Sequence, residues 1–199
     1  MKPLLVASSL LLAFVVRSNA VVILIDDSTR NGGFESGVAS PWGGISAVMD
    51  SAFAHGGSYY GAVSGTRGDV FQFLPISNSN GHDFSFTFWA RIPAVDGFAS
   101  LSVSLSDTGF GTSASVTPIL EPALSSSEWR FFSYNFTTPP VWNDSGNSKI
   151  SIAFPNSPGT RTAYLDDVTF VQVPEPSSML LCAFAFLATI VLRKGIFSS

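Results

Sequence analysis

Few residues of this 199-residue chain have the types and spacing that enzyme catalysis requires. A hydrolytic triad needs a histidine that a carboxylate orients beside a nucleophile. The chain has two histidines, His55 and His82, and each is next to a glycine in a turn-like sequence. It contains no Gly-x-Ser-x-Gly elbow, no His-Glu-x-x-His motif and no glycine-rich phosphate loop. Fourteen acidic residues always allow some pair suited to glycoside hydrolysis, so such a pair is not specific. The sequence therefore predicts a protein that is not an enzyme.

Aromatic side chains are better candidates for a functional site. In residues 84–91 three phenylalanines alternate with other residues, and Trp89 and Arg91 point to the opposite side. If the phenylalanines form the core, Trp89 and Arg91 are on the surface. Tyr60 and Trp142 fall in loop or strand-end sequences where they could line a cleft. An aromatic ring stacked on a sugar ring, with polar groups around it, is a common binding arrangement. The alternative is that these four residues are packed aromatics, since Trp and Tyr are well buried on average.

The elements that would position these side chains have the period-two pattern of β-strands. Apolar and polar residues alternate in five segments, which are residues 84–91, 101–106, 132–136, 150–152 and 164–170. Clusters of Gly, Pro, Asn and Ser separate these segments, as turns require. About eight to ten short strands in roughly 150 residues are typical of a β-sandwich or jelly roll. We therefore expect an all-β jelly-roll domain over residues 21–172.

Residues 1–20 have the three parts of a secretory signal peptide. Lys2 supplies a positive charge, residues 4–16 form an apolar run, and Ser18 and Ala20 are the small residues of a cleavage site. The run is shorter than the roughly 20 residues that span a bilayer. We therefore expect a cleaved signal peptide and an exported domain.

Residues 173–199 combine a proline-rich linker, an apolar stretch and a basic pair. Two prolines flank a glutamate, an apolar helix is expected over residues 178–192, and two basic residues follow it. The residues of this pattern are Pro174, Glu175, Pro176, Arg193 and Lys194. In a chain with a signal peptide, the pattern resembles the PEP-CTERM protein-sorting signal of bacteria.

This resemblance implies processing by an exosortase, a membrane protease that recognises the signal and cleaves near the Pro-Glu-Pro. The precursor would be in the inner membrane, with 178–192 as a transmembrane helix. The mature protein would then reach the cell surface or the extracellular matrix. The alternative is an ordinary single-pass membrane anchor.

Between residues 30 and 172 the chain contains several short motifs whose order along the sequence is informative about the fold. They are Asn31-Gly32-Gly33-Phe34-Glu35, His55-Gly56-Gly57-Ser58-Tyr59, Phe86-Thr87-Phe88-Trp89-Ala90-Arg91, Glu128-Trp129-Arg130 and Tyr164-Leu165-Asp166-Asp167-Val168. Together they are similar to the carbohydrate-binding-module type of galactose-binding-like jelly roll. The resemblance implies a structural calcium ion that joins the first strand to the last, with Glu35 and Asp166 as ligands and Asp50 as a third donor. Calcium takes six to eight oxygen ligands. The alternative is that these acids are solvated strand ends.

The charge distribution bears on the partners of the domain. Residues 21–176 hold all fourteen acidic residues and six of the ten basic ones, a net charge of −8. A nucleic-acid binder needs a basic surface, so nucleic acid is excluded as a partner. Cys182 is the single cysteine, which excludes an internal disulfide framework.

We therefore expect an exported surface or matrix protein whose non-catalytic domain binds extracellular polysaccharide. The alternative is a structural matrix protein that has no sugar ligand and acts by protein contacts. A cleft lined by Trp89, Arg91 and Tyr60 would favour sugar binding, and a face filled by Ser and Thr would favour the alternative.

Overall fold

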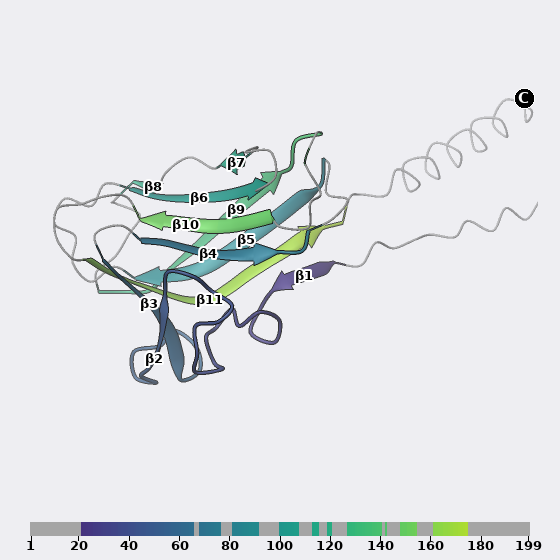
Figure 1. Ribbon diagram of the computed structural model, residues 1–199. Helices are drawn as coiled ribbons and strands as arrows, with labels where there is room; N and C mark the ends of the chain where they lie inside the picture. The colour runs from purple at the N-terminus through teal and green to yellow at the C-terminus, as the bar shows by residue number, and fades with distance from the viewer. Residues whose placement is uncertain are drawn as a thin grey trace, which may run out of the picture. The chain divides into compact units, whose positions relative to one another are not determined.

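The computed structural model describes residues 21–65, 68–76, 81–91, 100–107, 113–115, 119–120, 127–140, 142, 148–154 and 161–174. These residues form β-strands in two layers and contain no helix, which confirms the expected all-β sandwich (Figure 1). None of them belongs to a helix long and apolar enough to cross a membrane. The predicted signal peptide and the sorting segment after Pro174 are outside the described residues.

The first layer, sheet A, is entirely antiparallel and has the strand order β2–β3–β11–β5–β9, with β1 also paired to β11. Its strands are β1 (Val22–Ile25), β2 (Ser46–Met49), β3 (Tyr59–Gly65), β5 (Asp83–Arg91), β9 (Arg130–Thr137) and β11 (Arg161–Val173). Val22 pairs with Gln172, so the first and last strands of the domain are neighbours.

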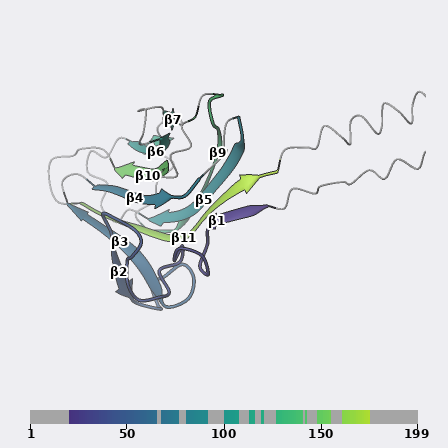
Figure 2. The same cartoon turned by 45° about the vertical axis from the view of Figure 1, so that its right-hand side comes forward.

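The second layer, sheet B, has the order β4–β10–β6–β7, and β8 also pairs with β6. Its strands are β4 (Gly68–Leu74), β6 (Ser100–Asp107), β7 (Ser113–Ser115), β8 (Ile119–Leu120) and β10 (Ser148–Phe154). Figure 2 shows β4, β10 and β6 as one layer and β3, β11 and β5 as the other.

The core between the sheets follows from the period-two pattern. On β5, Phe84, Phe86 and Phe88 are fully buried, whereas the residues between them are partly exposed. Phe170 of β11 stacks on Phe84 with 5.3 Å between ring centroids and meets Phe86 edge to face at 5.7 Å. Apolar residues of β4, β6 and β10 cover these rings from the other layer. The alternation that predicted the strands therefore also predicts which faces are buried.

Strand β11 departs from this alternation at one point. Asp166 pairs with Trp89 and Thr169 pairs with Thr87, so β11 contains one extra residue, a β-bulge. Asp167 has a φ of 47°, in the left-handed region. Because of the bulge, Leu165 and Val168 are both buried although they are three residues apart.

We predict that Phe170→Ala lowers the free energy of unfolding by about 3–5 kcal/mol, because it leaves a cavity among packed rings. Phe131→Ala is the control, since that ring is 54% exposed and its removal should cost about 1 kcal/mol or less. Urea unfolding measures both. Equal losses for the two variants would contradict the assigned core.

Candidate functional site

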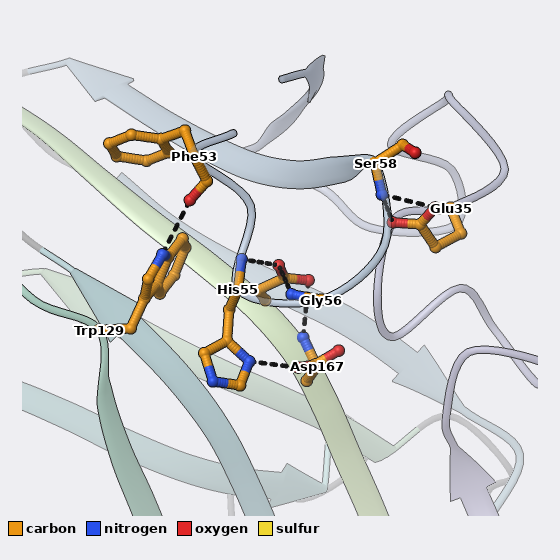
Figure 3. Close-up of polar contacts among 8 residues, drawn as sticks. Glu35, Phe53, His55, Gly56, Ser58, Trp129 and Asp167 are labelled. Carbon is orange, nitrogen blue, oxygen red and sulfur yellow. Dashed lines mark hydrogen bonds and ion pairs between the residues drawn. The ribbon is translucent and has the colours of Figure 1, made fainter. Parts of the chain in front are cut away.

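The loop between β2 and β3, residues 50–58, covers part of the outer face of sheet A. Its Phe53 ring lies 4.7 Å from Tyr164 and 4.9 Å from Tyr60, measured between centroids. The guanidinium carbon of Arg91 is 4.3 Å from the centre of the same ring, a cation–π contact. The Trp129 indole N–H donates to the Phe53 carbonyl at 2.9 Å (Figure 3). The loop is therefore packed onto the sheet.

The same loop also contacts Trp89. The His55 ring stacks on the Trp89 indole with 3.8 Å between centroids and 19° between planes. His55 Nδ1 is 2.5 Å from Asp167 Oδ2, which fixes the direction of the imidazole (Figure 3). One face of Trp89 is thus occupied by the protein itself.

These contacts revise the ligand-binding residues expected from the sequence. The structure does bring Trp89, Arg91 and Tyr60 together, but the loop covers them, and Tyr60 is only 7% exposed. Trp142 lies elsewhere, 3% exposed, and its indole N–H donates to Ser148 Oγ at 3.1 Å in the interior. Tyr60 and Trp142 therefore present no ring to a ligand. The sequence showed which face of β5 points outward, but it did not show that a loop folds over that face.

Two carboxylates anchor the loop to the ends of the domain. Asp166 is fully buried and accepts hydrogen bonds from the backbone N–H groups of His55 (2.9 Å) and Gly56 (3.2 Å). Glu35 accepts from the N–H of Ser58 at 2.9 and 3.1 Å (Figure 3). It also accepts from the N–H of Tyr59 at 2.9 Å. These bonds connect the opening and closing motifs through the His-Gly-Gly turn.

Glycine is required where the Glu35 carboxylate approaches the turn. Gly57 has a φ of 63°, and a Cβ there would lie 2.3 Å from Glu35 Oε1. A side chain at this position would displace the carboxylate that holds the turn.

The acids near this turn influence one another. Burial raises the pKa of Asp166 to about 7, although the N–H groups of Gly56, Asp167 and His55 stabilise its ionised form. Burial also raises the pKa of Asp27, and the negative charges of Asp167, Asp26 and Glu35 raise it further. Several negative charges are therefore concentrated here, and His55 Nδ1 lies against one of them, Asp167 Oδ2.

A hollow of about 280 Å³ lies beside these acids and is lined by Asp26, Asp27, Ser28, Asp167 and Thr169. Its side chains offer oxygen donors, the chemistry that calcium prefers. No set of three His, Cys, Asp or Glu side chains within the described part of the chain is close enough to hold a metal.

The predicted trio of calcium ligands is therefore not assembled. Asp50 instead caps its own turn by accepting from the N–H of Ala52 at 3.1 Å. Neither Asp27 nor Asp167 was among the ligands expected from the sequence, and the bulge that positions Asp167 is not visible in the sequence pattern.

The outer face of sheet B is a second candidate site. Its register places side chains in three parallel rows across the sheet. The outward residues are Asp69, Phe71 and Phe73 on β4, Ala153, Ser151 and Lys149 on β10, and Ser102, Ser104 and Ser106 on β6. One edge of this face is thus aromatic and the opposite side carries hydroxyl groups. We call this set of nine residues the sheet B face.

The aromatic edge is accessible. Phe73 is 48% exposed and meets Phe71 edge to face at 5.6 Å between centroids. The Lys149 ammonium nitrogen is 4.5 Å from the centre of the Phe71 ring. Ser104 and Ser151 share a hydrogen bond of 2.8 Å between their hydroxyl oxygens. An exposed ring, an ammonium group and hydroxyls together can contact both the apolar and the polar sides of a sugar.

The aromatic edge was hard to predict from the residue pattern. Residues 70–74 read Val-Phe-Gln-Phe-Leu, and the buried set includes the polar Gln72 while the outward set consists of phenylalanines. A prediction from hydrophobicity alone would therefore bury Phe71 and Phe73 and expose Gln72, the opposite of what the structure shows.

Solved structures that resemble this chain share its fold at low sequence identity. A Family 16 Carbohydrate Binding Module-2 is 18% identical, with 70% of this chain and 96% of that chain covered and a TM-score of 0.52. The CBM22-1 xylan-binding domain of Xyn10C from Paenibacillus barcinonensis is 14% identical, with 78% and 97% covered and a TM-score of 0.57. An apo cyclase from a Fischerella species is 14% identical, with 80% and 100% covered and a TM-score of 0.59. The fold therefore occurs in both binding modules and enzymes.

The search of curated proteins found no match. A family model described as a carbohydrate binding domain, CBM_4_9, matches residues 26–158. This range runs from the acids after β1 to the end of sheet B, and it includes the turn anchored by Glu35 and the sheet B face. The chain belongs to this carbohydrate binding domain family.

Proposed function

We propose that the domain binds polysaccharide without catalysis and that the sheet B face is its binding surface. The observation that carries this proposal is the exposed Phe73 ring beside rows of hydroxyl and ammonium groups. A sugar ring stacked on Phe73 would direct its hydroxyl groups across β10 toward the serines of β6. The family match supports a carbohydrate as the ligand.

A structural role without a sugar ligand is the second candidate, and the serines favour it. Ser104 and Ser151 already satisfy one another, and Ser106 Oγ donates to the Lys149 carbonyl at 3.4 Å. Hydroxyls paired within the protein are less available to a ligand. The exposed Phe73 ring supports sugar binding over a purely structural role, because it offers a surface on which a sugar ring can stack.

We also propose that the protein is exported and sorted to the cell surface or matrix. The signal-peptide pattern of residues 1–20 and the Pro-Glu-Pro, apolar and basic pattern of residues 173–194 support this route. An exosortase would process the precursor in the membrane near Pro174.

Calcium is a further proposal for the hollow beside Asp27 and Asp167, where oxygens other than carboxylates would have to complete a ligand set that the described acids do not form by themselves. A bound cation would supply positive charge where burial and neighbouring acids raise the pKa of Asp27. It would favour the ionised carboxylates and so stabilise the junction between β1 and β11.

The sugar-binding proposal predicts that Phe73→Ala weakens binding by about tenfold, because the stacking surface is removed. Affinity gel electrophoresis of the full chain in neutral detergent, with soluble polysaccharides in the gel, measures this loss. Phe131→Ala is the matched control, since it removes an exposed ring from sheet A. A wild-type chain that no polymer retards would refute sugar binding and favour the structural role.

The sorting proposal predicts a mature protein that begins near Val21 and ends close to Pro174. Mass spectrometry of the protein isolated from the native envelope and medium gives both ends. An intact C-terminus in the membrane fraction would instead indicate a simple anchor.

The calcium proposal predicts that a chelator lowers the melting temperature at about pH 8 and has little effect at about pH 5, since metal binding needs ionised carboxylates. Asp166, whose pKa the fold raises to about 7, has its own effect on stability without a cation. Its contribution to the free energy of unfolding falls as pH rises from about 4 to about 7. Asp167→Asn should abolish the chelator effect. An unchanged melt in excess chelator at about pH 8 would contradict a bound cation.

A further inference from the structure

The charge of the sheet B face differs from the charge of the domain around it. Residues 21–176 carry a net charge of −8. Two cations nevertheless lie at the Phe73 end of this face, Lys149 on β10 and Arg30 beside the edge of β4. The acidic residue of the face, Asp69, is four residues along β4 at the opposite end.

Lys149 is placed to act together with Phe73. The two residues are paired across β10 and β4, so their side chains leave the same face side by side. The Lys149 ammonium rests over Phe71 at 4.5 Å. In the described part of the chain no carboxylate is within ion-pair distance of it. Its charge is therefore available to a ligand that contacts Phe73.

Arg30 contacts the backbone of β4 at Phe73. Its guanidinium Nη1 donates to the Phe73 carbonyl at 3.3 Å, and its own carbonyl accepts from Gln72 Nε2 at 3.1 Å. Arg30 has a φ of 64°, an unusual conformation for a residue with a side chain. These two contacts hold Arg30 against the edge strand, and a guanidinium group has further N–H donors besides the one used here.

We propose that the polysaccharide bound by this face is anionic, a uronate-bearing chain whose carboxylates lie toward Lys149 and Arg30 while a sugar ring stacks on Phe73. This proposal rests on the proposed function and names its ligand class. Charge complementarity carries it, because among the described residues two cations, Lys149 and Arg30, lie beside the exposed Phe73 ring of sheet B. A neutral glycan would make no use of this arrangement.

The test compares polygalacturonate with the same polymer after chemical reduction of its carboxyl groups. Both are placed in the gel for affinity electrophoresis of the full chain. Wild-type protein should bind polygalacturonate more tightly, and Lys149→Gln should weaken that binding by about fivefold at low salt. The variant should lose clearly less affinity for the reduced polymer than for polygalacturonate, because Lys149 still belongs to the surface that any bound sugar contacts. Lys149→Arg keeps the positive charge and should therefore keep the wild-type preference for polygalacturonate over the reduced polymer.

Arg130→Gln is the matched control, since it removes one positive charge from sheet A, where Arg130 pairs with Glu128 at 3.4 Å. It should leave both affinities unchanged. Equal binding of the two polymers, or an equal effect of Arg130→Gln and Lys149→Gln, would overturn the anionic ligand but leave sugar binding in place. A wild-type chain that binds neither these polymers nor neutral glucans and xylans would overturn the proposed function itself.

Discussion

The structure depends on the buried Asp166 carboxylate, which accepts hydrogen bonds from the backbone N–H groups of His55 and Gly56. This interaction ties the last strand to the loop between β2 and β3 and holds the loop on sheet A. Burying a carboxylate costs free energy unless it is hydrogen bonded. The two N–H groups of the turn offset that cost, and the carboxylate in turn holds the turn in place. Because the loop stays in place, His55 stacks on Trp89 and Tyr60 is buried, while Phe131 beside Trp89 is 54% exposed. The outer face of sheet B is then the surface with an accessible aromatic edge and a full set of polar neighbours.

Sheet register determines what this accessible surface can do. Antiparallel pairing places Phe73 opposite Lys149 and Lys149 opposite Ser106, so aromatic, charged and hydroxyl groups follow one another across three strands. No loop has to move to bring them together. An arrangement set by strand pairing suits an extended ligand that lies across the strands.

Much of the fold was predictable from the sequence, because alternation along a half-buried strand is a local property. The phenylalanines of β5 show it, and their burial follows directly. The site was less predictable, since it depends on non-local features. The bulge at Asp167 interrupts the alternation of β11, and the packing of Phe53 and His55 places the loop against Arg91 and Trp89. The aromatic edge could not be predicted from residues 70–74, because the polar Gln72 is buried while Phe73 is exposed.

The most direct test of the central claim is to map the bound ligand on the protein surface. Backbone amide chemical shifts, recorded during titration with short oligogalacturonides, report the contacted strands. The account predicts the largest changes at Phe71 to Phe73, at Lys149 to Ser151 and at Ser104 to Ser106. Changes confined to Trp89, Arg91 and the loop of residues 50–58, with sheet B unaffected, would contradict it.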